Sequence, residues 1–240
     1  MKLEIYVKKI VLLMTVLGLL YAGIASVFGV QGATVISAGE SSRANFSDTS
    51  SASTSVQAGN VTELNISGTA ITDHWAGFFG DISGSVTLQT SDGSVFYNWS
   101  GLSSVSGEVF ASTDDAVTWG GIGCASGAEI TTVETALGIA ATDADTIGLT
   151  YSSISHPGFS VAGVGLSGCN STNTYVNNGV KDPSTFYQVF LTDTEGDAVY
   201  TTLINETTQG FDGNNHDFQL LVGESDAAGV TPMYFYLELN

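Results

Sequence analysis

From residue 60 onward, apolar and polar positions alternate with a period of two, and clusters of Gly, Asn, Asp and Ser interrupt the alternation. This period is that of a β-strand with one buried face, so the pattern predicts a body of short antiparallel strands. Two pairs of strands flank the turn sequences TSDG and TDTEGD, and we expect each pair to form a hairpin. The predicted strands are residues 61–66, 86–88, 95–99, 186–191, 199–204, 218–222 and 233–239.

The stretch 74–89, HWAGFFGDISGSVTLQ, places three aromatic residues beside three glycines. The parity of its apolar positions favours a packed strand over an aromatic surface that binds a ligand. Residues on the apolar parity of this strand and of strand 95–99 are predicted to line the core: Phe78, Val95, Tyr97 and Trp99. Trp75 and Phe79 fall on the opposite parity, where they either pack beneath another segment or form an exposed patch for a partner.

The middle of the chain has a different character. Residues 120–123 are rich in glycine, and residues 127–139 carry an apolar stripe at helical spacing that predicts one short helix. We therefore expect a Gly-rich insertion at about residues 112–170. The whole pattern predicts an all-β fold for residues 59–240, a two-sheet antiparallel sandwich or jelly roll with one short helix in the insertion.

The N-terminus indicates export. Residues 10–30 form an uncharged, mostly apolar run of 21 residues behind the basic stretch MKLEIYVKK. A cleaved signal usually has an apolar region of about 7–15 residues, and a spanning helix needs about 20. We expect residues 1–32 to be a signal peptide with a candidate cleavage site after Gly32, or a hydrophobic signal-anchor helix. A buried helical hairpin is the alternative.

Residues 33–58 are rich in Ser, Thr and Ala and poor in large apolar side chains. This composition is typical of an extended arm or stalk rather than of a core. Only the start of the segment has strand character. A segment within residues 45–58 is one candidate for a donor strand that pairs with an open sheet edge, and the start of the arm is the other: Ala33, Thr34, Val35, Ile36 and Ser37.

Acidic residues dominate the exported part. The chain has five Lys and Arg against 24 Asp and Glu, and the part after residue 32 keeps two basic and 23 acidic residues, a formal charge of −21. Nucleic acids and anionic membranes need a cationic surface, so we expect no nucleic-acid partner and membrane contact only through the N-terminal segment. The acidity indicates either solubility through mutual repulsion or binding of divalent cations.

Two acidic turns are candidates for a calcium site. The sequences DTEGD and DGNNHD cluster oxygen ligands around a turn glycine, although neither matches the EF-hand loop. Solvated β-turns have the same composition, so both interpretations stay open, and no other cofactor is expected. The candidate ligands are Asp193, Glu195, Asp197, Asp212, Asn214 and Asp217.

Two covalent modifications fit an exported chain. Cys124 and Cys169 are the only cysteines, and one disulfide between them is the default in an oxidising compartment, with two free buried thiols as the alternative. Six Asn-x-Ser/Thr acceptors for N-glycosylation begin at Asn45, Asn60, Asn65, Asn98, Asn170 and Asn205.

The sequence contains no signature of catalysis. Its three histidines, at positions 74, 156 and 216, lack the short spacing of a zinc site. A nucleophile elbow, a phosphate-binding loop and a dinucleotide fingerprint are all absent from the sequence. We expect the protein not to be an enzyme.

Three stretches resemble a group of secreted archaeal surface β-sandwich glycoproteins. These are WAGFFGDISGSV at residues 75–86, GFDGNNHDFQLLV at 210–222 and MYFYLEL at 233–239. The group shares a W-x-G-F-F/Y-G-x-x-S/T-G stretch, a G-F-D…D-F-Q stretch and an aromatic tail. The resemblance implies an archaeal envelope or extracellular glycoprotein and carries no activity. More loosely, the layout is similar to that of subunits of archaeal threads and bundling pili.

Two functions follow as hypotheses. The first is a structural glycoprotein subunit of an extracellular filament or envelope layer, a homo-polymer joined by strand addition from the N-terminal arm. The second is a membrane-tethered surface module for adhesion or glycan binding, which keeps residues 10–30 as its anchor. Both place the protein at the cell surface.

Overall fold

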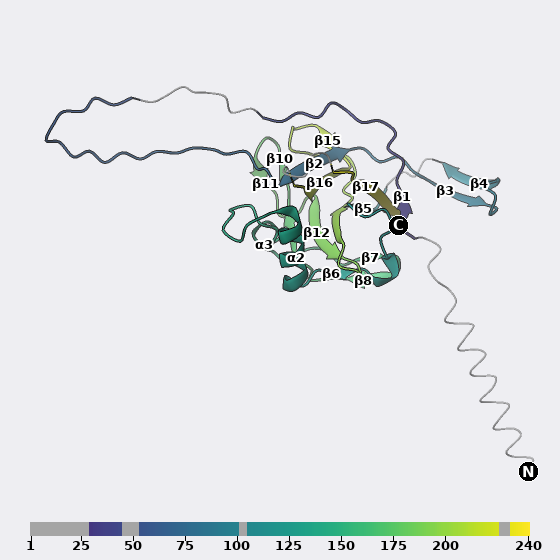
Figure 1. Cartoon of the computed structure of the whole chain (residues 1–240). Helices are drawn as coiled ribbons and strands as arrows, with labels where there is room; N and C mark the ends of the chain where they lie inside the picture. The colour runs from purple at the N-terminus through teal and green to yellow at the C-terminus, as the bar shows by residue number, and fades with distance from the viewer. Residues whose placement is uncertain (1–28, 45–52, 101–104, 226–230) are drawn as a thin grey trace, which may run out of the picture.

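A computed structural model describes residues 29–44, 53–100, 105–225 and 231–240. The expected N-terminal helix and the acceptor at Asn45 lie outside the described residues, apart from residues 29 and 30 of the apolar run. The all-β prediction is confirmed, because the described chain consists mostly of antiparallel β-strands with two short α-helices (Figure 1).

The largest sheet has seven strands. Six of them follow the order β1-β17-β5-β13-β12-β6, and β9 pairs with β12 beside β6. All of these pairings are antiparallel. The strands of this main sheet are β1 (Gln31–Gly32), β5 (Gly107–Ser112), β6 (Gly123–Cys124), β9 (Ser171–Asn173), β12 (Tyr187–Thr192), β13 (Ala198–Leu203) and β17 (Tyr234–Leu239).

Both faces of the main sheet are covered, which explains why every residue of β5 is buried. In β12, Phe190 belongs to one apolar cluster, whereas its neighbours Val189 and Leu191 belong to a second cluster on the opposite face. Because side chains alternate between the two faces of a strand, β12 contributes residues to both apolar clusters. The insertion supplies part of both, including Ile147 to the first cluster and Val161 to the second.

A two-stranded sheet lies over the first cluster. It pairs β2 (Trp75–Gly80) with β16 (Phe218–Gly223), and Leu220 and Val222 of β16 are fully buried against the main sheet. A side chain closes the other edge of β16. The buried Gln188 amide accepts a hydrogen bond from Leu221 N (2.9 Å) and donates one to Gln219 O (2.6 Å). It thus makes the hydrogen bonds to β16 that a neighbouring strand would otherwise make, and it links the two sheets.

The predicted helix is confirmed as α2 (Gly127–Leu137). Ser126 and Glu129 form a reciprocal capping box at its start, and Gly138 ends it with a left-handed φ of 75°. A second, unpredicted helix, α3 (Ile147–Thr150), begins at the Thr146 cap and packs beside α2. Among the described residues, no helix has the length and apolar character needed to cross a bilayer.

The remaining elements are small. A 3-10 turn, η1, covers Trp119–Gly121, and four further hairpins pair only with themselves. The hairpins are β3 (Ser85–Gln89) with β4 (Val95–Ser100), β7 (Phe159–Val161) with β8 (Val164–Leu166), β10 (Tyr175–Val176) with β11 (Val180–Lys181), and β14 (Thr208–Gln209) with β15 (Asn215–His216).

The hairpin β3–β4 corrects a prediction. Its turn forms as expected, with Gly93 at a φ of 87°. However, Val95, Tyr97 and Trp99, which we predicted to line the core, are 55%, 56% and 51% exposed. The reason is that no second layer of the described chain covers this hairpin, which stands apart from the body in Figure 1. The alternation of residues along the strands identified the apolar face, but it does not show whether another segment covers that face.

The burial of the aromatic residues of β2 does not follow their parity. Trp75 packs beneath the insertion, with its ring centroid 6.0 Å from that of Tyr151. Phe79 is half exposed beside Phe211. Phe78 was predicted to be core and is only partly covered, at 38% exposure, by an edge-to-face contact with Phe235.

The strand predicted at residues 61–66 does not form. These residues are exposed, and Val61, Leu64 and Ile66 have no sheet of the described chain to pack on. Residues 53–72 extend well beyond the body before the chain returns at β2 (Figure 1). An ion pair between Arg43 and Asp73 (2.5 Å) joins the chain before this excursion to the chain after it.

Candidate functional site

The outer edge of β17 pairs with β1, which directly precedes the N-terminal arm. Gln31 pairs with Leu237 and Gly32 with Tyr236, and Ala33 N donates a hydrogen bond to Phe235 O (2.9 Å). The strand therefore forms two residues earlier than the donor segment predicted from sequence. Of the five candidates at positions 33–37, only the first joins the sheet edge, and the others are exposed.

Val30 fixes this short strand to the body. It is half-buried and packs against the second apolar cluster, as Tyr236 also does. Beyond the strand, Val35 and Ile36 are 62% and 80% exposed. The arm thus offers two β-branched side chains directly after a segment that already pairs with a sheet edge.

Two buried glutamates lie on the inner side of β17. Glu108 of β5 and Glu238 of β17 are opposite each other in the antiparallel register, and they are 3% and 2% exposed. Burial and the nearby Glu238 raise the pKa of Glu108 to about 8, although a hydrogen bond from Asn240 (3.2 Å) favours its charged form. Burial also raises the pKa of Glu238, against a hydrogen bond from Ala162 N (2.9 Å).

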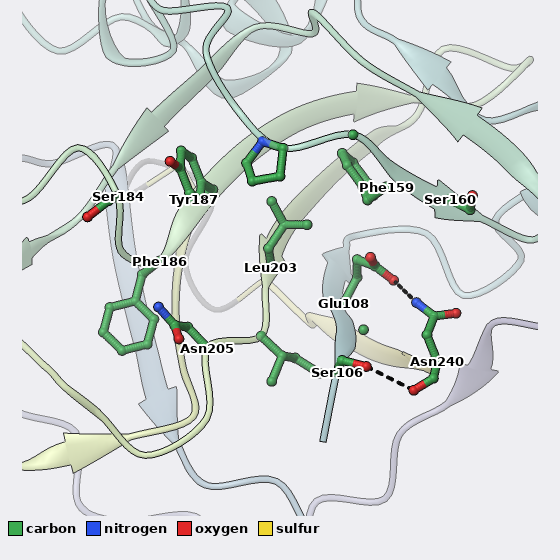
Figure 2. Close-up of a pocket in the computed structure, with 14 residues that line it drawn as sticks. Ser106, Glu108, Phe159, Ser160, Ser184, Phe186, Tyr187, Leu203, Asn205 and Asn240 are labelled. Atoms are coloured by element: carbon green, nitrogen blue, oxygen red, sulfur yellow. Dashed lines mark hydrogen bonds between the residues drawn. The ribbon is translucent and has the colours of Figure 1, made fainter. Parts of the chain in front are cut away.

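Glu108 lines a cavity of about 470 Å³ (Figure 2). Figure 2 shows Glu108 and Asn240 side by side at one end of the cavity, with Phe186 and Asn205 at the other. Polar and apolar side chains both line the cavity. Because Asn205 is a predicted glycosylation site, a glycan attached there would lie at this cavity.

Three carboxylates meet at the β12–β13 turn. Ligand oxygens of Asp114, Asp193 and Asp197 lie within 4.8 Å of one another, and their charge and spacing are those that hard divalent cations accept. Glu195 lies in the same turn without joining the group. The predicted calcium ligands therefore included Asp193 and Asp197 of this cluster but not Asp114, which lies in the segment after β5.

Hydrogen bonds already occupy part of this cluster. Burial alone would raise the pKa of Asp193, but backbone N–H donors outweigh it and hold the pKa below its ordinary value. The donors are Thr118 N (2.9 Å), Glu195 N (2.9 Å) and Asp197 N (3.1 Å). Burial and then the neighbouring carboxylates, Asp193 first, raise the pKa of Asp197. In this cluster, backbone N–H groups bind the Asp193 carboxylate, and the carboxylates of Asp114 and Asp197 lie beside it.

In the second predicted calcium loop, Asp212 and Asp217 have different structural roles. Asp212 caps its own turn, where it accepts hydrogen bonds from Asn214 N (3.0 Å) and Asn214 Nδ2 (2.8 Å) and lies 3.1 Å from His216 Nε2. Asp217 is buried and accepts hydrogen bonds from Ile82 N and Thr207 N, both at 2.8 Å. Within the described chain, these residues do not converge on one point as metal ligands.

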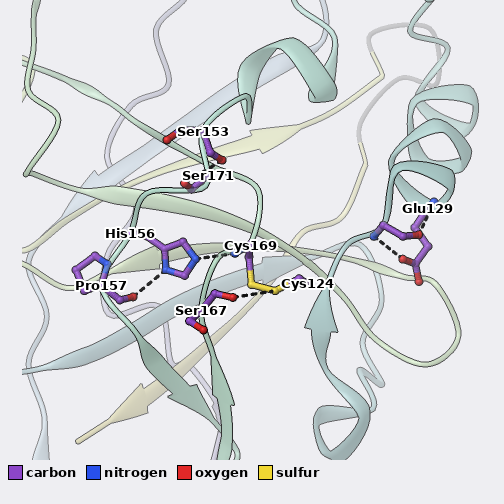
Figure 3. The surroundings of a disulfide bond; sticks show 9 residues. Cys124, Glu129, Ser153, His156, Pro157, Ser167, Cys169 and Ser171 are labelled. Atoms are coloured by element: carbon purple, nitrogen blue, oxygen red, sulfur yellow. Dashed lines mark hydrogen bonds between the residues drawn. A yellow bond between two sulfur atoms is a disulfide. The ribbon is translucent and has the colours of Figure 1, made fainter.

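The predicted disulfide is confirmed (Figure 3). Cys124 and Cys169 are bonded with a Cα–Cα distance of 4.9 Å, and the bond closes a loop with a sequence separation of 45 residues. Figure 3 shows His156 next to the bond, where its Nε2 accepts a hydrogen bond from Cys169 N (2.9 Å). The disulfide fixes β6 to the chain that enters β9.

The glycosylation acceptors fall into two groups. Asn60, Asn65 and Asn98 are exposed, whereas Asn170 and Asn205 are half-buried. On the hairpin β3–β4, position 98 is opposite position 87 and alternates with positions 97 and 99, so a glycan there would leave the apolar face clear.

Sequence reasoning missed Glu108 and Gln188, the two buried polar residues with the clearest structural roles. A signal was present for the acid, because GEVFAS places Glu108 within a short apolar strand where charges are rarely buried. Comparison of the chain with protein-family models, with curated proteins and with solved structures found no match.

Proposed function

We propose that the protein is a structural glycoprotein subunit of an archaeal extracellular filament or envelope layer, and that subunits join through strand addition by the N-terminal arm. The observation that carries the proposal is the pairing of residues 31–33, where the arm begins, with the outer edge of β17. A sheet edge that accepts the arm of its own chain presents the same hydrogen-bonding groups to the arm of another. The body would be a sandwich formed by the main sheet and the β2–β16 sheet.

Other features support an exposed, non-catalytic role. The disulfide is typical of proteins outside the reducing cytoplasm, and several acceptor asparagines are exposed. The resemblance of three motifs to archaeal surface glycoproteins gives the proposed source. The high acidity keeps separate molecules soluble until a specific strand contact joins them.

The test replaces residues 33–58 with a Gly/Ser linker of the same length. This change keeps the reach of the arm and removes its strand-forming side chains. Electron microscopy of the purified protein should show polymers for the natural chain and separate particles for the variant. A second variant that replaces only residues 53–58 serves as the control for linker composition. Polymers of unchanged length and abundance in the 33–58 variant would end the proposal.

A second candidate is the membrane-tethered adhesion module, and the hairpin β3–β4 favours it. Leu88, Tyr97 and Trp99 are each about half exposed on a hairpin that lies apart from the body. The rings of Tyr97 and Trp99 meet at 62°, so they do not form a flat platform for successive sugars, and they suit an apolar protein surface better. N-terminal sequencing of native protein separates the two functions, because an intact Met1 favours the tether and a start at Ala33 favours the polymer.

A further inference from the structure

Residues 29–33 cover the outer edge of the last strand of the main sheet. We name these residues the cap. The backbone of the cap pairs with Leu237 and Tyr236 and reaches Phe235, and Val30 packs into the second cluster. β17 would otherwise be an edge strand of six residues with apolar side chains on both faces, which is the kind of edge that recruits another strand.

The candidate cleavage site lies within this cap. Processing after Gly32 would remove Val30, Gln31 and Gly32 and leave only Ala33 from the cap. The outward-facing backbone groups of Leu237 would then lose the strand partner that the cap provides. A chain that keeps its leader covers its own edge, and a chain that loses the leader exposes it.

We propose that residues 29–33 are a removable cap, and that a chain processed after Gly32 accepts residues 34–37 of a second copy on the exposed edge of β17. This inference rests on the proposed function, because it specifies which edge accepts the arm and which residues the arm contributes. It makes the processing step the event that converts a capped molecule into a polymerising subunit.

The incoming segment fits the edge better than the cap does. A shift of five residues places Val35 where Val30 lies and Ile36 where Gln31 lies, opposite Leu237. Val35 repeats the side chain that already packs into the second cluster. Ile36 brings an aliphatic group to the side of Leu237, which packs against the first cluster. The segment is uncharged, so it adds no repulsion in an acidic protein.

The arm is tethered in a way that favours a neighbouring copy. In its own chain, a shift of five residues would draw the arm back by about 17 Å at roughly 3.3 Å per residue. Residues 39–42 would then have to span the path to the Arg43–Asp73 ion pair that residues 34–42 span now. A processed N-terminus that begins at Ala33 can instead leave this ion pair in place and reach outward by up to about 33 Å.

The experiment uses the full chain with a site-specific protease sequence inserted after Gly32. One copy carries Ile36→Cys and a second copy, with a different mass tag, carries Leu237→Cys. Cross-strand neighbours lie at Cα distances that a disulfide can span. Cleavage of the mixture should produce a disulfide-linked heterodimer on a non-reducing gel, and the uncleaved mixture should not. The control is a single chain with Gln31→Cys and Leu237→Cys, which should form an internal disulfide only before cleavage.

A second measurement does not depend on the new cysteines. Hydrogen exchange at the Leu237 amide should accelerate roughly tenfold or more after cleavage in dilute solution, and should slow again when the concentration is raised. The matching amide of Val189, in the centre of the main sheet, should not change and reports that the body stays folded.

The possible results distinguish failure of the removable cap from failure of the polymer function. A heterodimer that forms equally without cleavage would overturn the removable cap. An internal disulfide in a single cleaved chain that carries both Ile36→Cys and Leu237→Cys would overturn it too, because the arm would then be returning to its own edge. Polymers in the cleaved sample without the heterodimer would overturn the cap as well, while the proposed polymer function would stand. Cleaved protein that forms neither polymer nor heterodimer would remove both.

Discussion

Replacement of Glu108 by Gln should change how the stability of the protein depends on pH. Folded Glu108 has a pKa of about 8, whereas an ordinary glutamate has a pKa of 4.5. Between these two values the folded state therefore binds more protons than the unfolded state. The free energy of unfolding must fall as the pH rises through this window, because each increase in pH favours the state that releases the proton more readily.

The magnitude follows from the pKa difference. A difference of about 3.5 pKa units at roughly 1.4 kcal/mol per unit gives about 5 kcal/mol, lost between pH 4.5 and pH 8. This value is a ceiling, because relaxation of the surroundings and entry of water reduce the cost of a buried charge. Glu108→Gln keeps the shape and removes the charge. It should leave stability at pH 4.5 nearly unchanged and raise it by several kcal/mol at pH 9.

Urea denaturation followed by tryptophan fluorescence at closely spaced pH values tests this prediction. The natural protein should lose stability from pH 5 to pH 8.5, and Glu108→Gln should remove most of the slope. Glu63→Gln, at an exposed position in the segment that precedes β2, is the matched control and should keep the slope of the natural protein. Stability of the natural protein that rises from pH 5 to pH 8 would show that Glu108 is not held protonated by the fold.

Four further changes test other parts of the structure. Gln188→Leu leaves one buried and one partly buried backbone group of β16 without partners and should cost about 2–5 kcal/mol in urea denaturation; a cost below about 0.5 kcal/mol would contradict the bridging role. Joint replacement of Cys124 and Cys169 by Ser should cost about 4 kcal/mol for a loop of this length, measured in the same way, and an unchanged midpoint would show that the bond does not constrain the unfolded chain. Asp197→Asn should raise the melting temperature at pH 7 in the presence of a chelator, because it removes like-charge repulsion, and a lower melting temperature would show that the carboxylate is needed without metal. Trp99→Ser should change stability by less than about 1 kcal/mol, since the ring is half exposed, and a larger loss would mean that the hairpin packs on the body.

Features that depend on neighbouring residues could be predicted from the sequence. The helix predicted at residues 127–139 ends at Leu137 because Gly138 provides a left-handed cap, and both hairpins formed around their predicted turns. The disulfide followed from the count of cysteines and the signs of export. In each case the determining interaction lies within a few residues or involves the only available partner.

Features that depend on distant segments could not be predicted. Strand 95–99 has the alternation of a buried strand, but burial requires a second layer, and none of the described elements covers that face. Residues 61–66 have strand character and lack a partner edge in the described part of the fold. Glu108 and Glu238 are far apart in the sequence, so only the register of β5 and β17 shows that two buried acids lie opposite each other.

β17 differs from the central strands of the main sheet in the length of its two neighbours: it pairs with β5 over six residues and with β1 over two. β12 and β13 pair over five residues in the centre of the sheet, with apolar clusters on both faces and the disulfide beside β12. β17 has a two-residue strand on its outer edge. Where it pairs with β5 on its inner edge, the carboxyl groups of Glu108 and Glu238 lie opposite each other, and burial and mutual repulsion oppose the ionisation of both. Short edge strands and buried acids each occur in ordinary stable proteins. In the proposed strand exchange, an incoming strand would replace only the two-residue pairing with β1, while the six-residue pairing with β5 would hold β17 in the sheet.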